Sequence, residues 1–247
     1  MSFVGRPNVG KSTLTNALVG QKVAITSSKP QTTRRAIRGI VHRSFGQLIV
    51  VDTPGLHRPK TLLGQRLNDL VESTLGDVDV IAFCVPANEV IAQGDTFINE
   101  QLSRYRQAKL IAVVTKSETV SKQKLAEQLL AVQKLRDWEA IIPVSAISGE
   151  QLEDLIKLLV EQMPESEALY PEESVTDEST EARICELVRE AALEGVRDEL
   201  PHSLAVTLDE MNPREDKPLI DVHVNVWVER DSQKAIVIGK GGSRLRE

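Results

Sequence analysis

After four residues the chain reads Gly5-Arg6-Pro7-Asn8-Val9-Gly10-Lys11-Ser12, and this stretch decides the fold. It has the spacing G-x-x-x-x-G-K-S, in which the glycines let successive backbone N–H groups point at phosphate oxygens. In this pattern the lysine reaches the β- and γ-phosphates and the serine hydroxyl binds Mg²⁺, while a helix starting near the lysine adds its positive dipole end. The stretch therefore predicts a phosphate-binding loop, whose site residues are Gly5, Asn8, Val9, Gly10, Lys11, Ser12 and Thr13.

A second phosphate motif follows in the run Leu48-Ile49-Val50-Val51-Asp52-Thr53-Pro54-Gly55. A strand that ends at Asp52 would deliver a carboxylate to the Mg²⁺ shell, and the Gly55 N–H could then sense the γ-phosphate. The two linked motifs predict a nucleotide switch and disfavour the alternative of an ordinary glycine turn before a helix. The site residues from this motif are Asp52, Thr53, Pro54 and Gly55.

Residues 1–163 alternate short apolar runs with amphipathic stretches, which predicts an α/β domain with a mostly parallel sheet. The predicted strands are Ala36–Val41, Leu48–Val51, Val80–Val85, Leu110–Val114 and Ile141–Val144, of which the first is antiparallel to the second. The predicted helices are Lys11–Leu18, Thr61–Leu75, Asp95–Tyr105, Ser121–Leu135 and Glu150–Gln162.

The rest of the chain has a different pattern. Residues 164–180 combine two prolines with dense acid and predict a linker that acts as a spacer. Residues 181–247 predict a small α+β domain, with a helix at Thr180–Asp198 and strands at Leu204–Met211 and Leu219–Arg230. In the last strand valines alternate with polar residues, which predicts one buried and one solvated face.

Composition sets limits on the function. The chain has 247 residues, 41% hydrophobic and 27% charged, and its formal net charge of −6 argues against bulk nucleic-acid binding. The acid is concentrated, however, since Glu161–Glu181 holds eight acidic residues and no basic one, whereas Lys234–Arg246 is basic. No apolar run approaches the roughly 20 residues that span a bilayer, and no signal-peptide pattern is present. With only Cys84 and Cys185, both in apolar patterns, we expect buried thiols and a reducing cytoplasm.

Two further strand ends indicate which base is bound. The strand Leu110–Val114 leads into Thr115-Lys116-Ser117-Glu118, where a carboxylate can accept the N1 and N2 hydrogens of guanine while the lysine stem covers the ring. The strand before Ser145 offers a backbone N–H to guanine O6. The predicted base-site residues are Thr115, Lys116, Glu118, Ser145, Ala146 and Ile147, and together they indicate GTP.

With these motifs the chain resembles the Era family of bacterial ribosome-assembly GTPases. The resemblance covers most of the two-domain pattern and is carried by Gly5–Ser12, Pro30-Gln31-Thr32-Thr33-Arg34, Asp52–Gly55, Val228–Lys234 and Gly239–Gly242. It implies a Ras-like GTPase domain at residues 1–163, followed by a KH-like domain of type II at residues 181–247. It also implies that Thr33, with Thr32 as the near alternative, binds Mg²⁺ only when GTP is bound. The predicted catalytic residues are then Lys11, Thr33, Asp52 and Gly55, and the predicted metal ligands are Ser12, Thr33 and Asp52.

The resemblance also implies partners. The segment Gly239-Lys240-Gly241-Gly242 has the G-x-x-G pattern with which KH modules clamp a single-stranded backbone. The implied ligand is small-subunit ribosomal RNA, and the implied role is assistance in assembly of the 30S subunit. The predicted RNA-binding residues are Ile236, Ile238, Gly239, Lys240, Gly241, Gly242, Arg244 and Arg246. A cytoplasmic monomer is expected, with a peripheral association at the inner face of the cell membrane as an addition, although no segment encodes an anchor.

Leu56 and Asn8 bear on hydrolysis, and the sequence departs from the family pattern at Thr115 and Glu118 and at its two ends. Leu56 stands where many GTPases have a water-orienting glutamine, which predicts slow hydrolysis. Asn8 suggests that K⁺ takes the place of an arginine finger, a group that contributes roughly 10³–10⁵ in rate. Thr115 and Glu118 replace the usual asparagine and aspartate, which predicts weakened guanine selectivity. Finally, the short lead before Gly5 and the end at Glu247 predict a first strand and a KH domain that are both incomplete.

Two other functions remain open at this point. One is a nucleotide-gated RNA scaffold with negligible turnover, which Leu56 and Glu118 favour. The other is a P-loop ATPase or small-molecule kinase, in which Thr115–Glu118 and Ser145–Ala146 would have no role.

Overall fold

The computed structural model describes residues 1–27, 29, 32–59, 61–194 and 203–246. It divides the chain into two compact units. The first comprises residues 1–26 and 33–177, and the second comprises residues 27–32 and 178–247. Pro30 and Gln31 of the predicted switch segment and residues 195–198 of the predicted helix lie outside the described residues.

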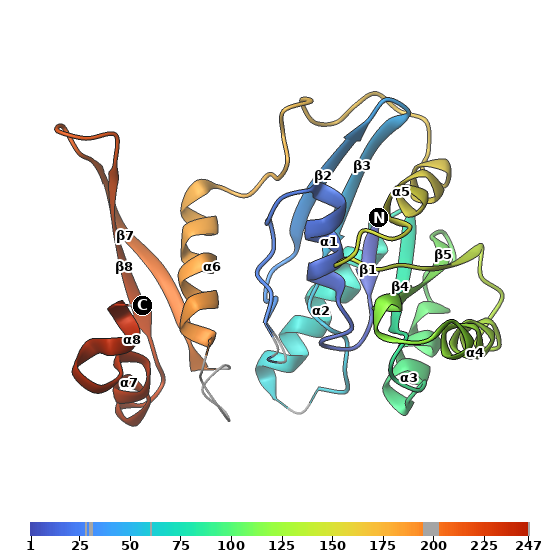
Figure 1. The fold of residues 1–247 in the computed structure, drawn as a ribbon, viewed down its shortest axis with the longest axis horizontal. Coiled ribbons are helices and arrows are strands. Elements are labelled where there is room, and N and C mark those ends of the chain that lie inside the picture. Colours follow the sequence, from blue (N-terminus) through green and yellow to red (C-terminus); the bar gives the residue numbers. More distant parts are fainter. Residues whose placement is uncertain (28, 30–31, 60, 195–202, 247) are drawn as a thin grey trace. The chain divides into compact units, whose positions relative to one another are not determined.

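The first unit is built on a six-stranded sheet with the order β2-β3-β1-β4-β5-β6 (Figure 1). Its strands are β1 Ser2–Val4, β2 Ile37–Arg43, β3 Gly46–Asp52, β4 Val80–Pro86, β5 Lys109–Thr115 and β6 Ala140–Pro143. Only the β2–β3 pair is antiparallel, as the sequence predicts, and all other pairs are parallel. The carboxyl ends of the parallel strands therefore meet at one edge, where open α/β sheets bind their ligands.

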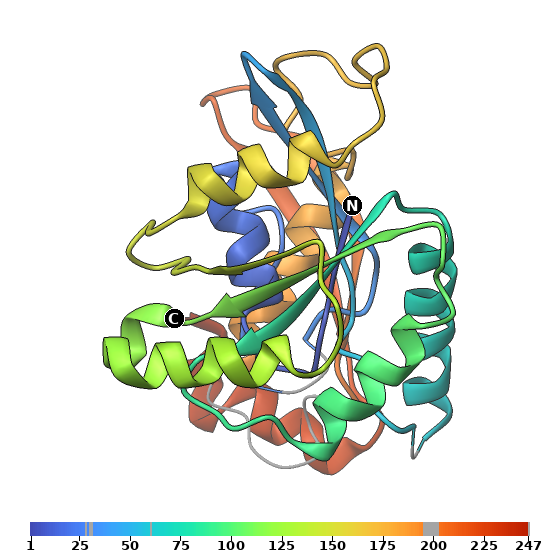
Figure 2. The same cartoon turned by 90° about the vertical axis from the view of Figure 1, so that its right-hand side faces the viewer.

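Helices cover both faces of this sheet (Figure 2). They are α1 Lys11–Val19, α2 Leu62–Gly76, α3 Gln93–Leu102, α4 Lys122–Gln133 and α5 Leu152–Glu161. Leucines and isoleucines of α1 and α5 pack on one face, and apolar residues of α2, α3 and α4 pack on the other. Strand β4 is buried along its whole length and sends alternate residues into the two clusters, which explains its continuous apolar sequence.

The predicted linker is a structured part of the first unit up to Asp177, which differs from the expected spacer. The amide of Ile40 in β2 donates to the Val175 carbonyl, and Gly39 forms an antiparallel bridge with Thr176. The Gln47 side chain accepts from the Tyr170 amide. The prolines and acidic residues of this segment predict a spacer. Its backbone instead pairs with the open edge of β2 and provides hydrogen-bond partners for backbone groups that would otherwise face solvent.

The second unit contains α6 Thr180–Leu193 and an antiparallel pair, β7 Ala205–Pro213 and β8 Ile220–Trp227. After β8 come α7 Asp231–Ile238, a 3₁₀ turn at Lys240–Gly242 and the short helix α8 Ser243–Arg246. The Ser179 side chain accepts from the Ala182 amide and caps α6, as its position before an amphipathic run predicts. Within this unit Arg189 is buried, pairs with Glu186 and donates to the Thr32 carbonyl.

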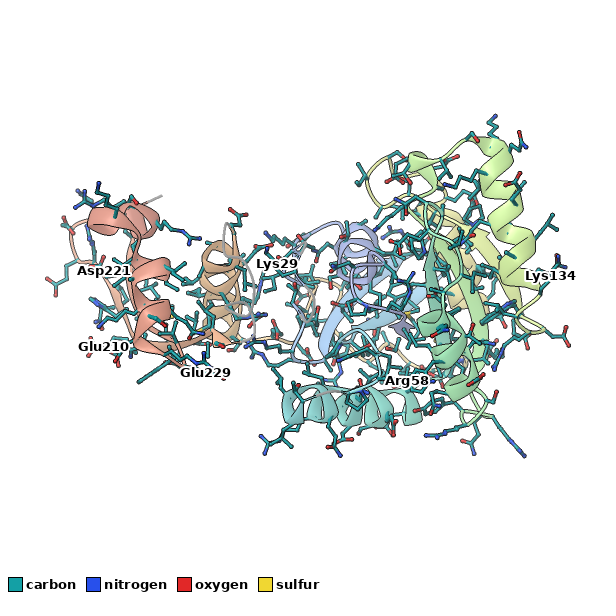
Figure 3. All side chains as sticks on the ribbon, turned by 90° about the horizontal axis from the view of Figure 1, so that it is seen from below. Lys29, Arg58, Lys134, Glu210, Asp221 and Glu229 are labelled. Carbon is teal, nitrogen blue, oxygen red and sulfur yellow. The ribbon has the colours of Figure 1, made fainter. Side chains whose placement is uncertain are left out.

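The β7–β8 pair is only partly covered. Val226 and Val228 pack against the small cluster formed by Leu193, Leu204 and Val237, whereas Val222 is exposed. The predicted buried valine face is therefore present at the end of β8 near Trp227 and absent at its start. Figure 3 shows the carboxylates of Glu210, Asp221 and Glu229 on this part of the chain. No helix in the described part of the chain is long and apolar enough to cross a membrane.

Candidate functional site

The phosphate loop lies between β1 and α1 and has the backbone that its glycines predict. Gly10, which caps α1, has φ 99°, and Asn8 also lies in the left-handed region with φ 64°. A Cβ on Gly5 would lie 2.6 Å from the Cys84 carbonyl oxygen, so only glycine fits there. The order of β1, loop and helix thus puts the first backbone amides of α1 and its positive dipole end beside the loop, as a phosphate requires.

Lys11 is buried, with 6% of its surface exposed. Its ammonium donates to the Gly5 carbonyl at 3.1 Å and to the Arg6 carbonyl at 2.9 Å. Burial lowers the pKa of Lys11, and the nearby Asp52 carboxylate partly opposes this shift. A desolvated ammonium held by loop carbonyls is positioned to exchange them for phosphate oxygens, since an anion compensates its charge better.

Three oxygen-bearing side chains meet beside the loop. The Ser12 hydroxyl donates to Asp52 Oδ2 at 2.6 Å and lies 3.0 Å from the Thr33 hydroxyl, which lies 3.4 Å from the same carboxylate oxygen. Asp52 Oδ1 is buried and has no hydrogen-bond partner among the described atoms, and burial raises the pKa of this carboxyl. Hard oxygen donors with an unsatisfied carboxylate oxygen fit Mg²⁺, which binds through one or two carboxylates plus phosphate oxygens and water.

The structure separates the two candidate threonines. Thr33 joins Ser12 and Asp52, whereas the Thr32 hydroxyl donates to the Lys29 carbonyl. Among the described residues no three His, Cys, Asp or Glu side chains form a metal cluster, so this hydroxyl–carboxylate group is the candidate metal site there.

The segment after Asp52 packs directly on the phosphate loop. A Cβ on Gly55 would lie 2.6 Å from the Pro7 nitrogen, and the Leu56 amide donates to the Gly5 carbonyl at 3.2 Å. The Leu56 side chain is buried in the apolar cluster on the α2 face. Leu56 therefore acts as a packing residue and offers no polar atom to an attacking water, which agrees with the expectation of slow hydrolysis.

The predicted base-site residues lie at the ends of β5 and β6. The Thr115 hydroxyl donates to the Val9 carbonyl at 2.6 Å, and the Lys116 ammonium donates to the Asn8 carbonyl at 2.8 Å. Both ties join the base motif to the phosphate loop. Glu118 is exposed on the 3₁₀ turn Ser117–Thr119.

The loop after β6 completes this edge of the sheet. The Ser117 amide donates to the Val144 carbonyl at 3.2 Å, so the two predicted base segments are joined. The buried Ser145 hydroxyl accepts from the Ser148 amide at 2.9 Å and shapes the loop, whereas Ile147 is 80% exposed. Ala146 is half-buried between them.

Sequence reasoning missed Asn16, which organises the chain just after α1. Its side-chain oxygen accepts from the Val23 and Ala24 amides at 2.9 and 2.8 Å, and its NH₂ donates to the Ala24 carbonyl at 2.7 Å. The available signal was an amide in an otherwise apolar helix stripe, where a polar side chain needs partners. It also missed Arg6, whose guanidinium donates to Asp95 and Glu89.

The glycine loop of the second unit lies between α7 and α8, as predicted. Gly239, Gly241 and Gly242 all have positive φ values between 65° and 77°. A Cβ on Gly241 or Gly242 would lie in open space, so these positions leave room for a ligand backbone. Lys240, which follows Gly239, is exposed. The described loop therefore has the shape and charge that a KH clamp needs.

The predicted side chains around this loop differ in their availability. Ile236 is 49% exposed on α7, Ile238 is half-buried, and Arg246 is exposed. The Arg244 guanidinium donates to the Ile236 carbonyl at 2.9 Å and to the Glu194 carbonyl, so it connects the last turn of α7 with the end of α6. The predicted contact of Arg244 with phosphate stays a prediction, because its guanidinium is hydrogen-bonded to these two backbone carbonyls.

Comparison with known proteins identifies both units. A family model described as 50S ribosome-binding GTPase matches residues 1–116, and a KH domain model matches residues 199–247. GTPase Era of Mycolicibacterium smegmatis is 63% identical over 248 residues, which cover 99% of this chain and 83% of the relative. GTPase Era of Streptomyces coelicolor is 58% identical, over 99% of this chain and 80% of the relative.

Two solved structures are similar over nearly the whole chain. A crystal structure of Era in complex with MgGDPNP and nucleotides 1506–1542 of 16S ribosomal RNA matches with a TM-score of 0.94 and 34% identity, over 100% of this chain and 83% of that one. An Aquifex aeolicus Era variant bound to GDP and AlF₄⁻ matches with the same score and identity, over 99% and 83%. With its phosphate loop, its Ser12–Thr33–Asp52 cluster and its KH-type glycine loop, the chain belongs to the Era family of GTPases.

Proposed function

We propose that this GTPase is a switch protein that binds small-subunit ribosomal RNA and assists assembly of the 30S subunit. The observation that carries the proposal is the contact of Thr33 with Ser12 and Asp52 beside the phosphate loop. It joins a segment outside the loop to the metal-binding group, as a nucleotide-sensitive switch requires. The similar structure that contains 16S ribosomal RNA and the KH-type loop support the choice of RNA.

The chain's own residues account for nucleotide binding and hydrolysis. Lys11 neutralises charge on the β- and γ-phosphates, and the loop amides from Gly5 to Ser12 bind the phosphate oxygens. Ser12 and Thr33 would hold Mg²⁺ through their hydroxyls, and the Asp52 carboxylate would accept from a water bound to the ion. Bound Mg²⁺ withdraws charge from the transferred phosphoryl group. In this proposal the Gly55 amide detects the γ-phosphate, so loss of that group releases both segments.

Hydrolysis is tested with Asp52→Asn. We expect multiple-turnover GTP hydrolysis by the unaltered protein and a loss of about 100-fold in the variant, because one electrostatic stabiliser contributes about 10²–10³ in rate. Asp69→Asn, an exposed carboxylate on α2, is the matched control. Turnover no faster than the GTP background in the unaltered protein would replace the proposal with the scaffold function, in which GTP gates RNA binding without being consumed.

We propose that Glu118 lowers guanine selectivity. Thr115 still makes the tie to the phosphate loop, so its replacement of asparagine is compensated. The turn that carries Glu118 is fixed by the Ser117 amide and by the Thr119 hydroxyl, which donates to the Lys116 carbonyl. Because this backbone is held in place, it does not shift to offset the extra methylene of glutamate, and the carboxylate is displaced from the edge of the guanine base.

This proposal predicts that Glu118→Asp tightens GTP binding about 10-fold to 100-fold and leaves ATP binding weak, since a charge-assisted hydrogen bond contributes about 1.5–3 kcal/mol. Titration with fluorescent GTP and ATP measures both, with Glu127→Asp on α4 as the control. Equal affinity of the unaltered protein for GTP and ATP would favour a generic P-loop nucleotidase, and weaker GTP binding by the variant would show that glutamate suits the base.

We further propose that K⁺ assists hydrolysis at Asn8. Leu56 offers no polar atom for the water, and the Arg6 guanidinium is engaged with Asp95 and Glu89, so neither replaces an arginine finger. Turnover should be at least severalfold faster in KCl than in NaCl at the same ionic strength, and this difference should vanish in Asn8→Ala. Equal turnover in the two salts would exclude the role of K⁺.

The remaining proposals concern state and location. We propose a cytoplasmic monomer, with peripheral binding at the inner face of the cell membrane as an addition. Light scattering tests the first against the chain mass of 27.3 kDa. Sedimentation with vesicles of anionic lipid tests the second, and a protein that stays in the supernatant would exclude it.

A further inference from the structure

Arg6 is a charged side chain inside the phosphate loop, and its contacts lie outside the loop. Its Nε donates to Asp95 Oδ1 at 2.8 Å, and its Nη2 donates to Glu89 Oε2 at 2.9 Å. The Asp95 side chain is fully buried, whereas the Glu89 side chain is 45% exposed. The pair with Asp95 is therefore screened from solvent and stronger than the pair with Glu89.

The two carboxylates belong to a braced segment. Asp95 lies in the first turn of α3, where its second carboxylate oxygen accepts from the Ala92 amide at 2.9 Å. The Glu89 carbonyl accepts from the buried Gln128 side chain at 2.9 Å. A Cβ on Gly94 would lie 2.7 Å from Arg6 Cδ, so this glycine leaves the space that the arginine stem fills. The partners of Arg6 are thus fixed by contacts of their own, and space for its side chain is left at the start of α3.

The backbone of Arg6 takes part in the nucleotide site. Its carbonyl accepts from the Lys11 ammonium at 2.9 Å. In the proposed function, on which this inference rests, that ammonium binds the phosphates. On either side, the Gly5 carbonyl accepts from the Leu56 amide, and Pro7 contacts Gly55. The first residues of the loop are therefore held by the switch segment through their backbone and by α3 through one side chain.

We propose that the Arg6–Asp95 pair is a positioning device that holds the phosphate loop open in its nucleotide-binding shape. When GTP binds, Lys11 leaves the Arg6 carbonyl for the phosphates, and the loop loses an internal tie. The anchor on α3 does not depend on the nucleotide and keeps the loop from collapsing in the exchange. A loop that is ordered beforehand binds its ligand without an added entropic cost, so the pair slows nucleotide release.

The experiment measures release of fluorescent GDP by stopped flow for the full chain with Mg²⁺. We expect Arg6→Gln and Asp95→Asn each to raise the dissociation rate about tenfold, and the double variant to exceed neither single variant, because both remove the Arg6–Asp95 pair. Arg6→Lys keeps the charge but makes one contact and should fall between. Glu100→Gln, an exposed carboxylate of the same helix, should release GDP at the unaltered rate.

A second readout separates positioning from stability. Removal of Arg6 leaves a buried carboxylate and lowers the melting temperature, but in steady state the larger share of the loss in kcat/KM for GTP should lie in KM. Asp95→Asn could fail to fold, and the Arg6→Lys and Arg6→Gln pair then carries the test. Unchanged GDP release in the folded Arg6 variants, or additive effects in the double variant, would overturn the proposal.

Discussion

The two units of this molecule bury their apolar residues to very different extents. The first has two clusters of 18 and 13 buried residues, one on each face of the sheet. Among its described residues the second has a cluster of three, and its strands expose Ile220, Val222 and Trp227. Because burial of apolar area is the dominant stabilising contribution, the first unit is stabilised by its own interior and the second far less by the residues described.

The difference matches the chemistry of each unit. The residues predicted to bind the nucleotide lie at the ends of strands that are buried on both faces. The distances between these residues are therefore fixed by the core. The glycine loop lies between short helical segments and needs only an open backbone with exposed charge. Catalysis requires groups held to a fraction of an ångström, whereas backbone clamping tolerates adjustment.

Core substitutions give the largest expected contrast. Phe83 is fully buried and stacks on Trp138 with ring centres 5.6 Å apart, so Phe83→Ala should lower the free energy of unfolding by about 3–5 kcal/mol. Val226 is half-buried, and Val226→Ala should cost about 1 kcal/mol or less. Urea denaturation measures both, and equal costs would contradict the difference between the units.

Nucleotide affinity should depend on the first unit alone. Lys11→Ala removes a buried ammonium beside the phosphates, and loss of its charge-assisted bonds should weaken GDP binding about 100-fold. RNA affinity measured without nucleotide should change less than twofold. Fluorescent GDP titration and RNA binding test the two halves, and a tenfold loss of RNA affinity would show that Lys11 acts on both units.

RNA affinity should depend on the glycine loop of the second unit. Lys240→Asp combined with Gly241→Asp places two carboxylates where a phosphate backbone would lie, which should reduce binding of single-stranded RNA about 30-fold to 100-fold. In a plot of the logarithm of the binding constant against the logarithm of salt concentration, the magnitude of the slope should also fall by about one for the lost lysine. Lys217→Asp, in the turn between β7 and β8, is the matched control, and an equal loss there would indicate a general charge effect.

The two thiols give the smallest expected effect. Cys84 is fully buried below the phosphate loop, and burial raises its pKa to about 12, so very little thiolate is present near neutral pH. Cys185 is 9% exposed in the second unit. In the native protein we expect Cys185 to react with a disulfide reagent severalfold faster than Cys84, since local opening depends on local stability. Comparison of Cys84→Ser with Cys185→Ser measures each rate, and faster reaction of Cys84 would reverse the order of the units.

Much of the fold could be predicted because the information is local. The five strands predicted with bounds in the first unit and all five of its helices lie within a few residues of those bounds, since alternating and 3.6-residue patterns report burial directly. The phosphate and base motifs also lie where strand ends predict, because parallel strands bring their carboxyl ends to one edge.

The features that could not be predicted depend on long-range contacts between polar groups. Arg6 and Asp95 are separated by 89 residues, and neither carries a local signal that names the other. The pairing of Val175 with Ile40 is hidden in a segment whose prolines and acid indicate a spacer. Polar contacts of this kind do not recur at a regular spacing along the chain, so they cannot be predicted from a sequence pattern.

By itself, the sequence determined the phosphate loop, the α/β succession, the base motif and the glycine loop, because each depends on residue types at short fixed spacing. Only the tertiary structure decided that Thr33 and not Thr32 joins Ser12 and Asp52, that Leu56 is buried, and that Arg6 is bound to α3. The physical reason is that a hydroxyl or guanidinium is assigned by the partner within hydrogen-bond distance, and that partner is chosen by the folding of distant segments.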